Sequence, residues 1–142
     1  MEFYQRRGFV LAKFYKNAIE NLRKIKPQIP MLAIITNGPK SQQYSRLENA
    51  KIYEYFSYIF VSEEIGYNKP SIKFFEYMFE KIEEKDKNKM LVLGDSLTSD
   101  IQGGINAGID TCWCNWKKKE NKTTIKPNYE INKLEELLSM LV

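Results

Sequence analysis

The stretch MLVLGDSLTSD, residues 90–100, decides the fold of this chain. Its first residues, Met90–Leu93, form an apolar run without polar alternation, as is typical of a strand buried on both faces of a parallel sheet. A glycine and two aspartates follow directly, in the order Gly94, Asp95 and Asp100. In open α/β sheets ligands bind beyond the carboxyl ends of the strands. This segment therefore predicts both a buried strand and a functional edge of the sheet.

Three other apolar runs predict strands of the same kind, at Met31–Ile35, Tyr58–Val61 and Thr111–Cys114. Helical patterns separate the strands. Apolar residues repeat at helical spacing in three stretches of the chain. These are Tyr15 to Ile25, then Ile72, Phe75, Phe79 and Ile82, and finally Leu134, Leu137, Leu138 and Leu141. Strands that alternate with helices build βαβ units. We therefore predict the α/β class, with a doubly wound, mostly parallel, Rossmann-like sheet.

The helix caps can also be read from the sequence. Ser71, directly after Pro70, is the predicted N-cap of the helix that begins near Ile72, and Asn132 opens the last helix. A further helix is predicted at Thr98–Ala107, directly after the aspartate segment.

Asp95 and Asp100 are the candidate metal ligands. Asp95 is expected at the tip of its strand, and Asp100 one turn into the helix Thr98–Ala107, facing the same opening. Two carboxylates that converge there offer the oxygen ligands that Mg²⁺ prefers, with water and substrate phosphate completing its coordination. The alternative is that one aspartate only caps the helix. That alternative explains one of the two residues and not both.

The strand Met31–Ile35 runs into Thr36, Asn37 and Gly38. A hydroxyl at a strand tip, followed by a tight turn, offers Thr36 Oγ1 and adjacent backbone amides to an anion. The alternative is a simple turn, since Asn-Gly is common in turns. Lys69 precedes Pro70 and a helix, so its backbone is held, and its ammonium can bind phosphate or steady a carboxylate. Each signal is weak alone.

The amino-acid composition excludes some kinds of active site. The chain has 142 residues, 43% of them hydrophobic, a net charge of +4 and no histidine, so histidine bases and histidine metal ligands are excluded. Its lysines are scattered except at 117–119, which favours a solvated surface over a nucleic-acid patch.

Cys112 and Cys114 share a strand face and are expected to be reduced packing residues. With neither a leader-like start nor a long apolar window, we expect a cytoplasmic protein with no membrane partner.

In order, Thr-Asn-Gly at 36–38, Lys-Pro at 69–70 and Gly-Asp-x-x-x-x-Asp at 94–100 resemble motifs II, III and IV of the haloacid dehalogenase (HAD) superfamily. The resemblance extends through Ser62–Gly66 and Asp100–Gly108, continues at Thr111–Trp113 and Asn115, and is similar to the 5′-nucleotidase branch. It implies a HAD-like core and a Mg²⁺-dependent phosphomonoester hydrolase that acts on a small phosphorylated metabolite such as a nucleoside monophosphate. Thr36, Asn37, Gly38 and Lys69 would bind phosphate, with Thr36 and Lys69 supporting the nucleophile, and Asp95 and Asp100 would hold the metal.

The family's motif I, Asp-x-Asp-x-Thr/Val, has no counterpart here. It supplies the nucleophile and the general acid, but the only aspartates are Asp86, Asp95, Asp100 and Asp110. We therefore expect residues 1–14 to be an unassigned segment and residues 15–142 to be a core truncated at its N-terminus, without the motif I strand and cap. The enzyme hypothesis predicts an isolated chain with little activity. The alternative is a non-catalytic phosphate- or metal-binding module of HAD fold.

The missing strand leaves a gap in the predicted sheet. In the family it lies between the strands that begin here at Met31 and Met90. Unpaired buried backbone groups cost about 1–3 kcal/mol each, so several cannot remain bare. Either these two strands pair directly, or residues 1–14 fill the gap, or a second copy of the chain supplies a strand and forms a homodimer.

Overall fold

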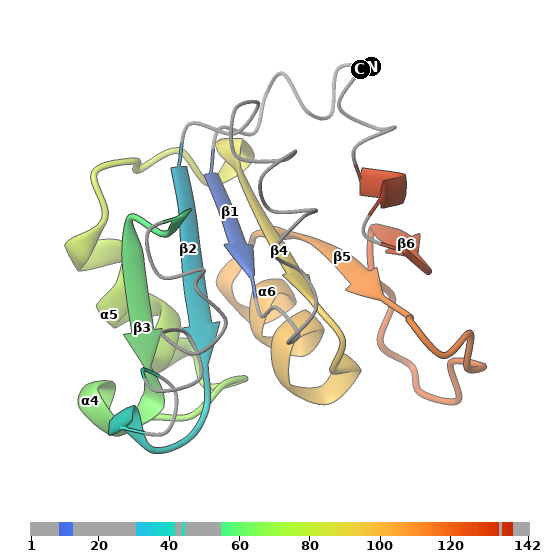
Figure 1. Ribbon diagram of the computed structural model, residues 1–142, viewed down its shortest axis with the longest axis horizontal. Helices are drawn as coiled ribbons and strands as arrows, with labels where there is room; N and C mark the ends of the chain where they lie inside the picture. The colour runs from blue at the N-terminus through green and yellow to red at the C-terminus, as the bar shows by residue number, and fades with distance from the viewer. Residues whose placement is uncertain (1–8, 13–30, 42–43, 45–54, 134, 138–142) are drawn as a thin grey trace.

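The computed structural model describes residues 9–12, 31–41, 44, 55–133 and 135–137. A single six-stranded sheet organises them, in the order β3-β2-β1-β4-β5-β6 (Figure 1). The strands are β1 (Phe9–Ala12), β2 (Met31–Thr36), β3 (Tyr58–Val61), β4 (Met90–Gly94), β5 (Asp110–Cys114) and β6 (Tyr129–Ile131). Every neighbouring pair is parallel, so the carboxyl ends of all the strands meet at one edge.

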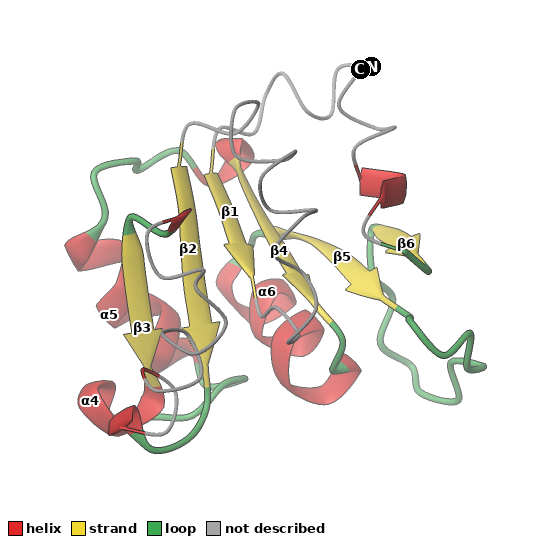
Figure 2. Cartoon of the chain, viewed as in Figure 1, coloured by secondary structure: helices red, strands yellow, loops and turns green. Residues whose placement is uncertain are grey.

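The helical segments with described bounds lie between β3 and β5 along the chain. They are α4 (Ser62–Ile65), α5 (Ile72–Lys81), the 3₁₀ turn η3 (Lys87–Lys89), the π-helical turn η4 (Leu97–Ile101) and α6 (Gln102–Ala107). The helices α5 and α6 lie behind the sheet in the view of Figure 2, where they cover one face. This arrangement confirms the predicted α/β class with a parallel, Rossmann-like sheet.

The four predicted strands are confirmed, with small changes at their ends. The strands β2 and β4 each continue one residue further, to Thr36 and Gly94, and β5 begins one residue earlier, at Asp110. Two strands were not predicted. They are β1, which has 4 residues, and β6, which has 3 residues with Glu130 exposed in the middle and so is not a continuous apolar run.

The strand β1 fills the expected gap. It pairs with β2 on one side and β4 on the other, and Ala12 lies opposite both Ile34 and Leu93. Of the three alternatives, the structure therefore shows the second, in which a segment of residues 1–14 supplies the strand. Part of the segment left unassigned by the sequence thus belongs to the core sheet. The partner strand of a second copy is not needed to complete it.

The buried face of helix α5 differs from the predicted one. Its predicted cap is confirmed, because Ser71 Oγ accepts a hydrogen bond from the Lys73 amide at 3.2 Å. The predicted stripe is wrong at its first residue, since Ile72 is 37% exposed. The buried face instead consists of Phe74, Phe75, Met78 and Ile82. The stripe shifts because the sheet and α6 approach from that side, and Gly103 of α6 leaves room for the Phe75 ring.

The helix predicted at Thr98–Ala107 is present in altered form. It begins as the π-helical turn η4 and becomes α-helical only at Gln102. The predicted helix at Tyr15–Ile25 lies outside the described residues, as do most of the last helix's stripe residues, although Leu137 is buried. Cys112 and Cys114 are free and buried, as expected. Within the described part of the chain, no helix is long and apolar enough to cross a membrane.

Candidate phosphate and metal site

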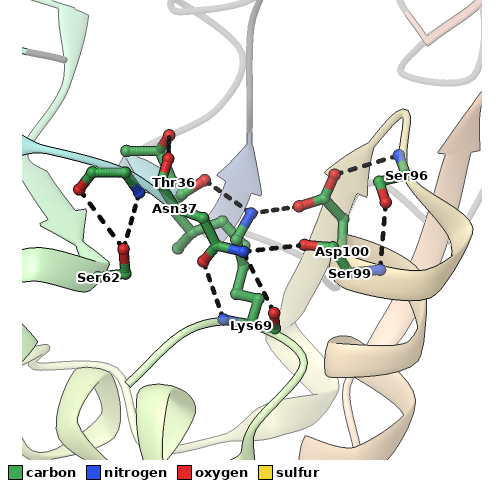
Figure 3. Close-up of polar contacts among 9 residues, drawn as sticks. Thr36, Asn37, Ser62, Lys69, Ser96, Ser99 and Asp100 are labelled. Carbon is green, nitrogen blue, oxygen red and sulfur yellow. Dashed lines mark hydrogen bonds and ion pairs between the residues drawn. The ribbon is translucent and has the colours of Figure 1, made fainter. Parts of the chain in front are cut away.

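An ion pair between Lys69 and Asp100 forms the centre of the site. The Lys69 ammonium contacts Asp100 Oδ1 and also donates to the carbonyl oxygen of Ile35 at 3.1 Å. The two side chains are 1% and 0% exposed. Ile35 belongs to β2 and Asp100 follows β4, so Lys69 bridges the two strands that flank β1 at their carboxyl ends (Figure 3).

The backbone of β4 and η4 positions the Asp100 carboxylate. The amides of Asp100 and Ile101 both donate to the Ser96 carbonyl, at 3.0 and 3.1 Å, and the second of these bonds widens the turn. Asp100 Oδ2 in turn accepts from the Ser96 amide at 3.2 Å. The carboxylate also packs on the Cα of Gly94, where a Cβ would overlap it. A glycine is therefore required directly before Asp95.

The helix cap after β4 is a serine and not an aspartate. Ser96 Oγ accepts from the Ser99 amide at 3.2 Å, so it satisfies the first turn. Asp100 lies inside the turn and faces Lys69. The alternative that this aspartate serves only as a helix cap therefore does not describe it.

Asn37 holds the two loops of the site together. Its Oδ1 accepts from the Lys69 amide at 2.9 Å, and its Nδ2 donates to the Lys69 carbonyl at 3.2 Å. Nδ2 also reaches Ser99 Oγ at 3.5 Å. One side chain thus joins the turn after β2, the Lys69 loop and η4, as Figure 3 shows.

The turn after β2 is braced from its other side. Ser62 Oγ accepts from the Gly38 amide at 2.8 Å. Gly38 has φ of 129°, in the region that favours glycine. The hydrogen bond and the backbone conformation together fix the Thr-Asn-Gly turn against the start of α4.

Thr36 and Asp95 lie at the same edge as the ion pair. Thr36 is the last residue of β2, is 5% exposed, and follows directly after the carbonyl that Lys69 contacts. Asp95 follows β4, and its backbone carbonyl accepts from Trp113 Nε1 at 3.0 Å. All four predicted residues therefore lie at the carboxyl edge, across 64 positions of sequence from Thr36 to Asp100. Direct contact joins Lys69 with Asp100.

The electrostatic environment extends to β5. Burial raises the pKa of the Cys114 thiol well above its usual range, with further increases from the neighbouring Cys112 and from Asp95 and Asp100. The negative charges of Asp95 and Asp100 thus contribute to the raised pKa of a thiol on the neighbouring strand β5. Cys114 remains a neutral thiol at neutral pH, which makes it a poor nucleophile.

Asp95 and Asp100 fit a Mg²⁺ site. Proteins commonly bind Mg²⁺ through one or two carboxylates, and the ion keeps several water ligands and also takes phosphate oxygens. The two aspartates supply such carboxylate oxygens at one edge of the sheet. A cage made by the protein alone is not formed, because the described residues contain no group of three His, Cys, Asp or Glu side chains placed to hold a metal. Asp95 is the more accessible ligand, since Asp100 is occupied by Lys69 and Ser96.

Comparison with known proteins agrees with the geometry. The family model described as haloacid dehalogenase-like hydrolase matches residues 2–114, and the chain belongs to this family. It is 48% identical over 110 residues to the HAD-hydrolase YfnB of Bacillus subtilis, covering 78% of this chain and 47% of YfnB. It is 41% identical over 110 residues to the pyrimidine 5′-nucleotidase YjjG of Escherichia coli, covering 78% and 49%. The chain thus spans about half the length of these curated relatives.

A crystal structure of YfnB, described as bound to magnesium, superposes with a TM-score of 0.84 at 43% identity. The match covers 89% of this chain and 55% of YfnB. The predicted family and fold are therefore confirmed, and the likeness extends over most of the chain.

Sequence reasoning missed the residues that brace the site. The sequence predicts Asn37 as a phosphate ligand in a turn but not its hydrogen bonds to Lys69. It predicts no site role for Ser62 or Ser99 and no packing role for Gly94. The order of the motifs signals that these loops meet, but hydrogen bonds across 32 and 62 positions leave no local pattern in the sequence.

Proposed function

We propose that this chain forms the phosphate-handling part of a Mg²⁺-dependent phosphomonoester hydrolase of the 5′-nucleotidase kind, acting on nucleoside monophosphates. The observation that carries the proposal is the buried ion pair of Lys69 and Asp100, tied to the ends of β2 and β4. Burying two charges is expensive unless each is paired. A pair of this kind at the ligand-binding edge of a parallel sheet favours a functional role.

The residues of this chain divide the work of holding the phosphate. Thr36 Oγ1 and the backbone amide of Asn37 would donate to phosphate oxygens, while the Gly38 amide donates to Ser62 Oγ and holds the turn in place. Lys69 holds the Asp100 carboxylate in place and supplies positive charge next to the anion. Asp95 and Asp100 would hold Mg²⁺, which when bound neutralises charge on the phosphoryl group. These parts position the substrate and stabilise charge, and they provide no nucleophile.

We further propose that the chain by itself turns over substrate slowly or not at all. Covalent phosphoryl transfer needs a carboxylate in line with phosphorus. The strand at the centre of the sheet, β1, has the sequence Phe-Val-Leu-Ala and contains no carboxylate. Asp95 and Asp100 cannot replace the nucleophile without weakening the metal site. This observation favours a second candidate function, a non-catalytic module of HAD fold that binds phosphate or metal.

A turnover assay tests the catalytic half of the proposal. Purified chain is incubated with millimolar Mg²⁺, a panel of nucleoside monophosphates and an aryl phosphate. We expect release of inorganic phosphate close to the blank. Robust turnover that Asp95→Asn abolishes would reveal a nucleophile in this chain and overturn the proposal of inactivity. Turnover that survives Asp95→Asn identifies a contaminating phosphatase.

A binding titration tests the phosphate site independently of turnover. Inorganic phosphate is titrated calorimetrically into the chain with and without Mg²⁺. We expect weak binding that Mg²⁺ strengthens, and Thr36→Val should weaken it about tenfold through the loss of one charged hydrogen bond. Thr124→Val is the matched control, because Thr124 is exposed in the loop between β5 and β6. Absence of binding, or equal effects of both variants, would contradict the site assignment.

A further inference from the structure

An open cavity of about 660 Å³ lies beside the proposed phosphate site. This volume falls in the range of small-molecule sites. Two segments line it, the turn after β2 and the segment from α4 to the Lys69 loop. The lining residues that matter here are Asn37, Gly38, Ser62, Glu63, Tyr67 and Asn68. Asn37 and Gly38 thus belong both to the cavity and to the proposed phosphate site.

The walls of the cavity are joined by hydrogen bonds between the two segments. Ser62 Oγ accepts from the Gly38 amide at 2.8 Å, and Glu63 Oε1 accepts from the Lys40 amide at 3.2 Å. Asn37 adds the pair of bonds to the Lys69 backbone described above. The cavity is therefore preformed, and a ligand does not have to order these segments to enter it.

Tyr67 supplies an aromatic surface at this cavity. Helix α4 ends at Gly66, whose φ of 90° turns the chain in the left-handed conformation. Before the turn, Ile65 packs against the hydrophobic core. After the turn, Tyr67 lines the cavity and remains 50% exposed. The glycine thus separates a side chain that stabilises the fold from one that faces the solvent-filled space.

Charge orients a ligand in this space. Asn37 and Gly38, which belong to the turn proposed to bind phosphate, form one end of the cavity, whereas Lys69 contacts Asn37 through its backbone and its buried ammonium is paired with Asp100. Glu63 lines the cavity on the α4 side, where its carboxylate repels an anion and accepts hydrogen bonds from N–H groups. Asn68 can both donate and accept. An uncharged planar ring with N–H and carbonyl groups satisfies this end of the cavity.

We infer that Tyr67 is a specificity-determining residue, and that its ring stacks on the base of a nucleoside monophosphate whose phosphate lies at the Thr36–Gly38 turn. This inference rests on the proposed function, since it uses the same phosphate site. It adds that the core itself recognises the organic half of the substrate. Stacking of a base on an aromatic side chain is tolerant of base identity, so we expect recognition of a base rather than of one particular base.

The test compares ligands that share a phosphate and differ in the base. Uridine 5′-monophosphate, ribose 5-phosphate and inorganic phosphate are titrated into the full chain with Mg²⁺. We expect uridine 5′-monophosphate to bind about tenfold more tightly than ribose 5-phosphate. Tyr67→Ala should remove this difference and leave ribose 5-phosphate binding unchanged, whereas Tyr67→Phe should retain it. In NMR spectra, the amide chemical shifts of Gly66 and Asn68 should change on addition of uridine 5′-monophosphate and not on addition of ribose 5-phosphate or inorganic phosphate.

Ile105→Ala provides the matched control, because Ile105 is a 42% exposed apolar residue of α6 that does not line the cavity. It should leave all three affinities unchanged. Equal binding of uridine 5′-monophosphate and ribose 5-phosphate by the unmodified chain would overturn the role of Tyr67 alone. An equal loss for both ligands in Tyr67→Ala would do the same. If none of the three phosphates binds, the proposed function fails, and the inference fails with it.

Discussion

The strands β1 and β4 are neighbours at the centre of the sheet, but they lead into different residues at their carboxyl ends. They run parallel and in register from Phe9 opposite Met90 to Ala12 opposite Leu93. The strand β4 leads into Gly94, Asp95 and Asp100, and the chain after β1 reads Lys-Phe-Tyr. The comparison teaches that an apolar strand is sufficient to complete the sheet, whereas chemistry depends on the residues beyond its carboxyl end.

The largest expected effect concerns the end of β4. Lys69→Met should destabilise the fold by about 3–5 kcal/mol, because it leaves the Asp100 carboxylate buried without its cation. Urea unfolding measures the loss. Lys69→Met with Asp100→Asn should recover much of it, since the uncompensated charge is then gone. The control is Lys73→Met, whose exposed pair with Glu76 spans 3.8 Å and should contribute less than about 1 kcal/mol. Similar losses in Lys69→Met and Lys73→Met would contradict the buried-pair account.

The scaffold role of β1 is tested by proline. Leu11→Pro removes an amide from a strand that is paired on both sides, and we expect a loss of about 3 kcal/mol or more in urea unfolding. Glu130→Pro in the edge strand β6 is the control. Ile131 accepts from the Asn115 amide, so in a parallel ladder the neighbouring Glu130 backbone points away from β5. If Leu11→Pro is as stable as the unmodified chain, β1 is not the central strand in solution.

A smaller effect is expected inside β4 itself. Gly94→Ala places a methyl group into the Asp100 carboxylate, and we expect a loss of about 1–3 kcal/mol from overpacking. The same change should weaken Mg²⁺ binding, because it displaces Asp100. Chemical denaturation and a Mg²⁺ titration measure the two effects. Unchanged stability together with unchanged Mg²⁺ affinity would show that the close packing at Gly94 is not needed.

The smallest effect is a pH dependence on β5, the other neighbour of β4. The folded state raises the pKa of Cys114, so the folded chain holds the thiol proton more tightly than the unfolded chain does. This contribution to stability is complete below the unfolded pKa of about 8.5 and is lost as pH rises through the folded pKa. Between pH 8 and pH 9.5 we expect a loss of about 1 kcal/mol. Urea unfolding of Cys114→Ala should lack this part of the slope, and an identical slope would contradict it.

Much of the fold followed from local patterns in the sequence. Four apolar runs predicted four strands within one residue at each end, because strands buried on both faces have a continuous apolar signature. The family followed from three motifs in order. The strand β1 was only one of three alternatives, because nothing local to its four-residue apolar run shows that it pairs between β2 and β4. The buried face of α5 was wrong at Ile72, because the direction of burial depends on α6 and the sheet.

For the site, the sequence alone determined which residue types stand at the carboxyl edge: Thr36, Lys69, Asp95 and Asp100. It did so because a parallel sheet brings the residues that follow each strand to one side. Only the tertiary structure decided that Lys69 pairs with Asp100, that Asn37 braces the loops, and that Tyr67 lines the cavity. These relations join groups about thirty positions apart or more, or depend on a backbone turn at Gly66. Strand order and packing set such distances, and the local sequence does not encode them.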